Sequence, residues 1–322
     1  MTRSVVGVLR GGTSSEYDLS LKTGAVVLSS LPEESYDTRD ILIDTHGVWH
    51  MRGLPTDAMR ALSQIDVAVN GLHGGEGEDG TVQRLFERAG VPYSGSSSLP
   101  SAMSLNKMRA REILQRAGIN MPRGVSFTVP SDMNSFEMAR KVFSSFGPPY
   151  IVKPAAEGAS AGIEIATTIL DLPRVLADVL DVFGAAVVEE YMEGDDATVG
   201  IIERFRDSDV YALPPARIEY LGDGRHIHRS HHSNGELRYI VPSDFRHSEK
   251  EALVDMAKAA HRALDLSHFS RADFIVTKHG PYLLEVNAYP GLYDGSAMSP
   301  MLESVGSSVP DFVQYAISNA RR

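Results

Sequence analysis

The segment that most constrains the fold is residues 271–291, which read RADFIVTKHGPYLLEVNAYPG. Apolar and polar residues alternate on both flanks of the sequence KHGP, and this pattern predicts two strands joined by a turn at residues 278–281. Successive side chains of a strand point to opposite faces, so the alternation sorts them into sets. The first strand divides into Ala272, Phe274 and Val276 on one face, and Arg271 and Asp273 on the other. The return strand divides into Tyr282, Leu284 and Val286, and Leu283, Glu285 and Asn287.

The turn fixes which polar residues face each other. A hairpin centred near His279 places Asp273 across from Glu285 and Arg271 across from Asn287. Directly opposed residues have Cβ atoms about 4.5–5.5 Å apart, and two carboxylates that close repel each other unless a cation or a proton lies between them. Two carboxylates and an amide oxygen suit Mg²⁺, which is usually completed by water and phosphate. The hairpin alone also fits a surface turn with solvated charges.

Length and charge limit the classes of function. A chain of 322 residues is long enough for two or three domains. A net charge of −11 argues against general binding to nucleic acid or to an anionic membrane, and the absence of cysteine excludes disulfides and cysteine catalysis. The N-terminus does not resemble a signal peptide, and the chain has no run of about 18 apolar residues, so we expect a cytoplasmic protein.

Strand-like and helix-like patches alternate over the first hundred residues, which predicts an α/β domain with a parallel sheet. Its strands are expected at 4–9 and 66–70, and its helices at 16–28 and 82–89. The rest of the chain is mixed. Its helices are expected at 104–117, 136–146, 172–182, 249–263 and 310–320, and its strands at 150–153, 186–191, 197–203 and 210–220.

Two loops in the first part of the chain are rich in glycine. The sequence GGTSSEYDLS at residues 11–20 allows a tight turn and a close approach to a ligand, or a helix capped by Ser14 or Ser15. It lacks the pattern GxGxxG, so the indication of a dinucleotide-binding site is weak. The sequence HGGEGEDG at residues 73–80 is too polar for a core element, and its His73 could bind a substrate or orient a neighbour. An acidic surface loop is the alternative.

Two later segments could hold a nucleotide. In YIVKPAAEGASAG, residues 150–162, Lys153 ends an apolar strand and small residues follow, which favours a flap that binds phosphate oxygens. A strand-end lysine on the surface is the alternative. In VVEEYMEGDDATVG, residues 187–200, paired acids end a strand where a nucleoside could lie, although such pairs are commonly solvated.

With these segments in this order, the chain resembles the D-alanine–D-alanine ligase family of the ATP-grasp superfamily, from residue 5 to about residue 318. The resemblance implies a mixed α/β protein with an ATP-grasp fold and an N-terminal, Rossmann-like parallel-sheet domain. The implied units are a substrate domain at 1–103, a central ATP-grasp subdomain at 104–187 and a C-terminal subdomain at 188–322. The implied activity joins two D-alanines through an acyl phosphate for peptidoglycan synthesis, with ATP as substrate, two Mg²⁺ ions (or Mn²⁺ in their place) and a homodimer.

The resemblance also implies roles for particular residues of this sequence. The implied ATP-binding residues are Lys107, Lys153, Glu157, Glu189, Glu190, Tyr191, Met192 and Asp196. The implied metal ligands are Asp273, Glu285 and Asn287. The implied catalytic residues are Glu16, Ser160, Arg271 and Gly291, and the implied amino-acid-binding residues are Glu16, His73 and Ser296.

The chain departs from the family in one connected place. Ala159 stands where the family has the first of two serines, and residues 222–239 contain no clear counterpart of a lysine and a tyrosine that close over the site. This loop instead contains four histidines, at positions 226, 228, 231 and 232, which could bind a metal, contact substrate or be solvated. Asn106 stands where the family often has an aspartate beside the lysine. Two alternatives therefore stay open: a different second substrate, such as D-lactate or D-serine, and a catalytically silent ATP-binding protein.

Overall fold

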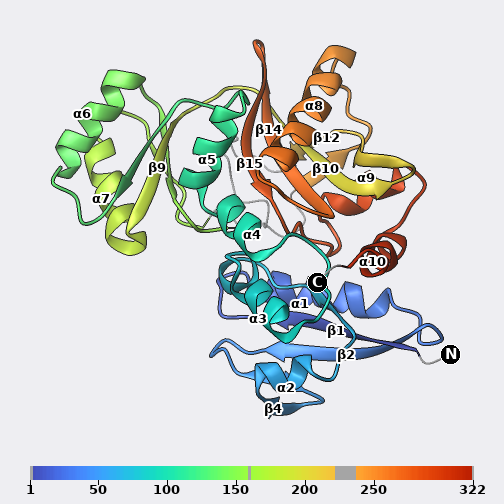
Figure 1. Cartoon of the computed structure of the whole chain (residues 1–322). Helices are drawn as coiled ribbons and strands as arrows, with labels where there is room; N and C mark the ends of the chain where they lie inside the picture. Colours follow the sequence, from blue (N-terminus) through green and yellow to red (C-terminus); the bar gives the residue numbers. More distant parts are fainter. Residues whose placement is uncertain (1–2, 159–160, 222–236, 321–322) are drawn as a thin grey trace.

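The computed structural model describes residues 3–158, 161–221 and 237–320. Predictions for Ser160, His226, His228, His231 and His232 fall outside these residues. The described strands form three sheets, of five, four and six strands. In Figure 1 the first sheet lies at the bottom, the second at the left and the third at the upper right.

The first sheet has the order β4-β3-β2-β1-β5, and β1 pairs in parallel with both β2 and β5. The predicted parallel sheet is therefore confirmed, with antiparallel strands added at one edge. The strands are β1 (Ser4–Gly11), β2 (Tyr36–Ile43), β3 (Trp49–Met51), β4 (Leu54–Thr56) and β5 (Val67–Asn70). The helices are α1 (Tyr17–Ser29), α2 (Ala58–Leu62), the 3-10 turn η1 (Gly75–Gly77) and α3 (Thr81–Ala89).

The helix predicted at 104–117 is confirmed as α5 (Lys107–Arg116), but its first residues belong to a separate helix, α4 (Ser98–Leu105). The chain breaks at Asn106, whose backbone is extended (φ −76°, ψ 99°) and whose side chain accepts a hydrogen bond from the Arg109 N–H at 3.1 Å. Asparagine and aspartate are both good N-cap residues, so the substitution at this position preserves the cap. The break makes Lys107 the first residue of α5.

The second sheet is antiparallel, with the order β6-β9-β7-β8. Its strands are β6 (Gly124–Thr128), β7 (Tyr150–Pro154), β8 (Glu164–Ala166) and β9 (Ala185–Glu190). The helices α6 (Ser135–Ser145) and α7 (Leu172–Phe183) lie beside β9 in Figure 1. A buried apolar cluster that includes Tyr150 and Leu176 joins these elements. The predicted helices and strands of this region are confirmed, and β6 and β8 are additional strands that the sequence pattern did not predict.

The third sheet has the order β13-β12-β10-β14-β15, with β11 paired to β10. Its strands are β10 (Asp195–Phe205), β11 (Ser208–Ala212), β12 (Ala216–Tyr220), β13 (Leu237–Ile240), β14 (Phe269–Thr277) and β15 (Gly280–Asn287). Helix α8 (His247–Ala263) packs against β10, β14 and β15, and α9 (Met298–Glu303) and α10 (Val309–Ser318) follow. The single strand predicted at 210–220 is wrong, because Pro214 and Pro215 interrupt it and cannot donate ladder hydrogen bonds.

None of the helices within the described ranges has the length and apolar character needed to cross a membrane.

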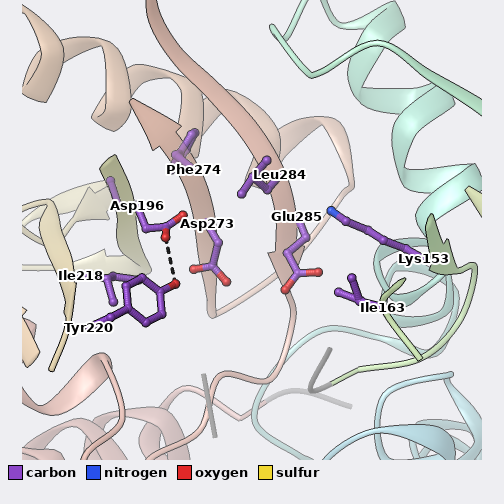
Figure 2. A pocket seen from close by; sticks show the side chains of 10 residues that line it. Lys153, Ile163, Asp196, Ile218, Tyr220, Asp273, Phe274, Leu284 and Glu285 are labelled. Carbon is purple, nitrogen blue, oxygen red and sulfur yellow. Dashed lines mark hydrogen bonds between the residues drawn. The ribbon is translucent and has the colours of Figure 1, made fainter. Parts of the chain in front are cut away.

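The hairpin β14–β15 has the predicted register at its polar end. Asp273 pairs with Glu285 and Arg271 pairs with Asn287. Figure 2 shows the carboxylates of Asp273 and Glu285 pointing into the same space. The turn is shorter than predicted, because β15 already begins at Gly280.

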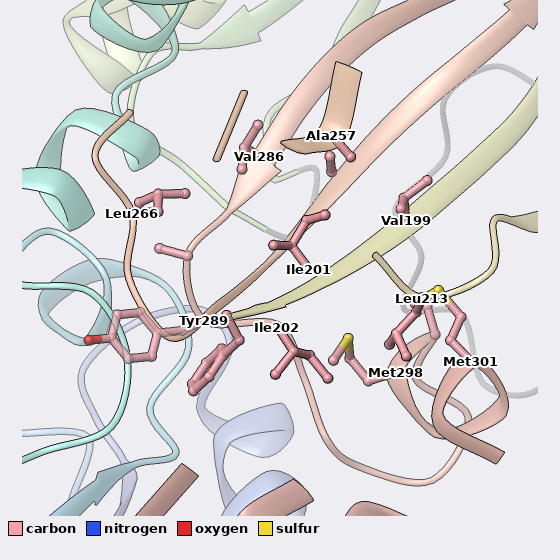
Figure 3. Packing of buried hydrophobic residues seen from close by; sticks show 14 of the residues in the cluster. Val199, Ile201, Ile202, Leu213, Ala257, Leu266, Val286, Tyr289, Met298 and Met301 are labelled. Carbon is pink, nitrogen blue, oxygen red and sulfur yellow. The ribbon is translucent and has the colours of Figure 1, made fainter. Parts of the chain in front are cut away.

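The predicted faces are wrong between the turn and Leu284, because the ladder contains a bulge. Phe274 pairs with Leu283 rather than with Leu284, and one extra residue on a strand reverses the facing of those beyond it. Leu283 is fully buried in the apolar cluster that also contains Val286, whereas Glu285 lines the pocket. Figure 3 shows Val286 in this cluster with Val199 and Ile201 of β10 and Ala257 of α8.

Candidate active site

A pocket opens where the second and third sheets approach each other (Figure 2). Its polar lining comes from β7, β10, β12, β14 and β15, and consists of Lys153, Asp196, Tyr220, Asp273 and Glu285. Five strands from two sheets therefore direct polar side chains into one space.

Asp273 is the most firmly held acid of the pocket. Its Oδ1 accepts from Thr198 Oγ1 at 2.6 Å, and its Oδ2 accepts from Asn287 Nδ2 at 2.9 Å. Arg271 Nε and Nη2 donate to its two oxygens at 2.9 and 2.7 Å. Burial lowers the pKa of Arg271, but the adjoining Asp273 carboxylate outweighs this effect and raises the pKa above its ordinary value. Asp273 itself is only 4% exposed. Donors from both neighbouring strands therefore fix this carboxylate.

The donors around Asp273 and Glu285 fit Mg²⁺. Two carboxylates and the Asn287 amide provide oxygen ligands, and Mg²⁺ ordinarily keeps waters and substrate phosphates in its other positions. Within the described part of the chain, no group of three or more His, Cys, Asp or Glu residues could hold a metal ion. The set is therefore too sparse for an all-protein cage and suits an ion shared with a phosphorylated substrate.

The two predicted phosphate lysines reach this region from different elements. Lys153 extends from β7 and, as Figure 2 shows, directs its ammonium group toward Glu285. Lys107 Nζ donates to the Glu157 carbonyl of the flap at 2.6 Å and lies 3.7 Å from Glu285 Oε2. Its backbone N–H donates to the Ala155 carbonyl at 2.7 Å, so the start of α5 is tied to the flap.

Glu189 forms ion pairs with two buried cations of the protein. Its Oε2 lies 2.7 Å from Lys153 Nζ, and its Oε1 lies 2.9 Å from Arg111 Nη1. All three side chains are buried. Sequence reasoning missed Arg111, although a basic residue on the buried stripe of α5, between Ala110 and Leu114, was a signal.

The other predicted nucleotide residues follow β9 and begin β10. Asp196 Oδ2 accepts a hydrogen bond from the Tyr220 hydroxyl at 2.8 Å at the pocket wall. Glu190 forms an ion pair with Arg123 at 2.7 Å. Tyr191 and Met192 lie in the connection between the two strands. Tyr220 was not predicted as a site residue.

Three segments converge on Glu16, which is 8% exposed. A Cβ atom built on Gly158 of the flap would lie 2.3 Å from Glu16 Oε1, and one on Gly74 would lie 2.7 Å from it. A larger residue at either position would therefore have to displace the Glu16 carboxylate. Burial, followed by the negative charges of Glu78 and Glu285, raises the pKa of Glu16 to about 8.

His73 lies beside Glu16 in a polar setting. Its Nε2 is 2.7 Å from Thr23 Oγ1, and its Nδ1 is 3.6 Å from Glu78 Oε1. The predicted serine cap of α1 is wrong, because Glu16 occupies the N-cap position. Ser14 instead donates to the His73 carbonyl at 2.5 Å and accepts from the Glu16 N–H at 3.2 Å, which joins the two glycine-rich loops.

The segment after β15 supplies the remaining predicted residues. Ser296 is buried, and its Oγ has no hydrogen-bond partner among residues 3–158, 161–221 and 237–320. Its N–H donates to the Tyr293 carbonyl at 2.9 Å. The Tyr293 ring contacts Gly291 and stands edge-on to His73, with ring centroids 6.4 Å apart. Tyr293 is a further residue that sequence reasoning missed.

The site therefore lies between two antiparallel sheets and places two lysines beside facing carboxylates. A buried glutamate and an arginine adjoin them. This arrangement is that of an ATP-grasp ligase site. The family model described as D-ala D-ala ligase C-terminus matches residues 113–318, and that described as D-ala D-ala ligase N-terminus matches residues 50–96. The chain belongs to the D-alanine–D-alanine ligase family, as its motifs predicted.

Individual relatives match over nearly the whole chain. A D-alanine–D-alanine ligase of Geobacter sulfurreducens is 33% identical, and the match covers 98% of this chain and 93% of the relative. One from Anaeromyxobacter dehalogenans is 30% identical, with 98% and 96% covered.

Solved structures confirm the predicted fold class. The D-alanine–D-alanine ligase of Bacillus anthracis complexed with ATP is 26% identical and superposes with a TM-score of 0.81, covering 99% of this chain and 97% of that one. VanG D-Ala:D-Ser ligase from Enterococcus faecalis has a TM-score of 0.85 at 23% identity, with 98% and 99% covered, and this likeness shows the fold alone.

The raised pKa of Glu16 leads to a testable pH dependence. If Glu16 holds the ammonium group of an amino acid, it must be ionised, and with a pKa near 8 it is mostly protonated at lower pH. We expect the KM for the first amino acid to fall about tenfold per pH unit as the pH rises toward 8, and then to level off. Steady-state kinetics measure this, and Glu16→Gln should have a high KM without this dependence. A wild-type KM that is flat from about pH 6 to about pH 8 would contradict the assignment.

The close approach of Gly158 leads to a second prediction. A methyl group at this position must displace the Glu16 carboxylate, and a misplacement of about 1 Å can cost about 10²-fold in rate. We expect Gly158→Ala to lower kcat/KM for the first amino acid by about that factor and to leave the melting temperature nearly unchanged. Gly147→Ala is the matched control, because a Cβ there meets no atom within 4 Å. Equal kinetics of the two variants would refute the contact.

Proposed function

We propose that this protein is an ATP- and Mg²⁺-dependent ligase that joins two D-alanines for peptidoglycan precursors. The observation that carries the proposal is the meeting of Asp273, Glu285, Lys107 and Lys153 beside the buried Glu16, in a chain of this family. The oxygen donors of the metal site also suit Mn²⁺.

The first step converts the carboxylate of one D-alanine into an acyl phosphate. A carboxylate oxygen attacks the γ-phosphorus of ATP, the bond to the β,γ-bridging oxygen breaks, and ADP leaves. Lys107 and Lys153 neutralise charge on the transferred group and hold it in line, which supplies most of the catalysis of such transfers. Mg²⁺, held by Asp273, Glu285 and Asn287, would neutralise further phosphate charge when bound.

The second step forms the peptide bond. The unprotonated amine of the second D-alanine attacks the acyl carbon, a tetrahedral oxyanion forms, and inorganic phosphate leaves. The Arg271 guanidinium and the Gly291 N–H are proposed to stabilise this oxyanion. Ser296 Oγ, which is buried and lacks a partner among the described residues, would donate to the carboxylate of the second D-alanine.

Glu16 serves the first D-alanine in this scheme. Its carboxylate lies among the start of α1, the 73–80 loop and the flap, so it would bind the ammonium group and orient the neighbouring carboxylate toward the phosphoryl group. His73 is held by Thr23 and Glu78 beside it.

A panel of D- and L-amino acids tests the substrate. Phosphate release and the product mass should identify D-alanyl-D-alanine as the principal product. If turnover occurs only with D-alanine plus D-lactate or D-serine, the protein is still a ligase, but its second substrate is not D-alanine. ATP binding without ADP formation for any amino acid would instead support a catalytically silent nucleotide-binding protein.

Arg271 has a specific prediction within this mechanism. Replacing it by alanine removes the proposed oxyanion donor, and the loss of one such donor typically costs about 10²–10³ in kcat. We expect Arg271→Ala to show this loss while retaining nearly wild-type affinity for ADP, measured by calorimetry. Because Arg271 also pairs with Asp273, Arg271→Lys serves as the control that keeps the charge. Parallel losses of ADP affinity and kcat would indicate that Arg271 only supports Asp273.

Assembly and location are further parts of the proposal. We propose a homodimer from the family resemblance, which light scattering in solution tests. We propose a cytoplasmic location, because the substrate ATP is supplied there. The three sheets, at residues 4–70, 124–190 and 195–287, support the proposal of three structural units. Strand β9 ends at Glu190, so we place the boundary between the central and C-terminal units after this residue rather than at 187/188.

A further inference from the structure

Arg111, Glu189 and Lys153 form a buried ion chain that connects α5 with β9 and β7. The Arg111–Glu189 distance is 2.9 Å and the Glu189–Lys153 distance is 2.7 Å. The three side chains are only 6–7% exposed. Lys153 is the member that also lines the pocket.

The buried ion chain has an unequal charge. It contains two cations and one anion, and Arg111 Nε and Nη2 have no hydrogen-bond partner within the described residues. Burying charge is costly, and a neutral pair or apolar residues would serve stability at least as well. The excess positive charge of this ion chain, of which Lys153 reaches the pocket, therefore suits a function that involves an anion.

Arg111 changes what Lys153 can offer to such an anion. An ammonium group has three donors, so Lys153 can bind Glu189 and still donate to a phosphate oxygen. Arg111 attracts the other oxygen of Glu189 and balances part of its charge. Without Arg111, Lys153 and Glu189 would form a closed neutral pair, and Lys153 would attract phosphate less strongly.

The position of Arg111 on α5 strengthens this connection. Lys107 and Arg111 are four residues apart, so they project from the same side of the helix, about one turn apart. Lys107 reaches the flap and Glu285 directly, whereas Arg111 reaches Lys153 through Glu189. One helix therefore helps to hold both lysines.

We propose that Arg111 is a positioning residue that holds Glu189, and through it Lys153, for binding the phosphates of the nucleotide. This rests on the proposed function for the identity of the nucleotide. In this role Glu189 Oε2 binds Lys153, while Arg111 holds Glu189 through Oε1.

The test compares nucleotide affinities of Arg111 variants. Arg111→Met should weaken ADP binding about tenfold and leave adenosine binding unchanged, because only the phosphates meet Lys153. Arg111→Lys should restore most of the ADP affinity. Arg109→Met is the matched control, since it removes the same charge from an exposed position of the same helix, and it should behave like wild type. Calorimetry gives both affinities, and thermal melting monitors the fold.

Arg111→Gln keeps the proposal testable if the methionine variant does not fold. Glutamine can still donate to Glu189 but lacks the charge, so its ADP affinity should also fall relative to adenosine. Wild-type ADP affinity in a folded Met or Gln variant, or equal weakening of ADP and adenosine, would overturn the proposal. These results are distinct from failure of the proposed function, in which the wild-type protein binds ADP but forms no dipeptide, or binds no ADP at all.

Discussion

The pairing of Asp273 with Glu285 across β14 and β15 is the constraint on which the candidate site depends. A slip of one residue would turn either carboxylate toward the apolar core. The bulge at Leu284 reconciles two demands on β15, because Leu283 and Val286 enter the core while Glu285, only two residues after Leu283, faces the pocket. The core therefore holds the register that the chemistry requires, and Thr198 from β10 fixes Asp273 from the other side.

Local patterns in the sequence predicted much of this arrangement. The alternation of apolar and polar residues predicted the hairpin and the register at its polar end, and the distinctive loops predicted the family and the fold class. The predictions failed where two local signals compete. Asn106 can end one helix or begin another, and here it does both. Pro214 and Pro215 end a strand inside an apolar run that otherwise reads as continuous.

The partners of the site residues could not be predicted in the same way. Arg111 is 78 residues from Glu189, and Thr198 is 75 residues from Asp273, so only the packing of whole sheets brings them together. The bulge was hidden for a related reason. Leu283 and Leu284 are both apolar, so the sequence pattern does not show which of them faces the core. The burial of Leu283 depends on neighbours elsewhere in the chain.

The electrostatics of the site follow one pattern. Each of its cations is held by an acceptor of the protein: Lys107 by the Glu157 carbonyl, Lys153 by Glu189 and Arg271 by Asp273. These contacts reduce the cost of burying the cations, and each cation has more donors than these contacts use. A phosphate or an oxyanion can therefore add to an existing set of hydrogen bonds and meet groups that are already oriented. Such preorganisation supplies most of the rate acceleration in phosphoryl and acyl transfer, because the donors need little reorientation when the transition state forms.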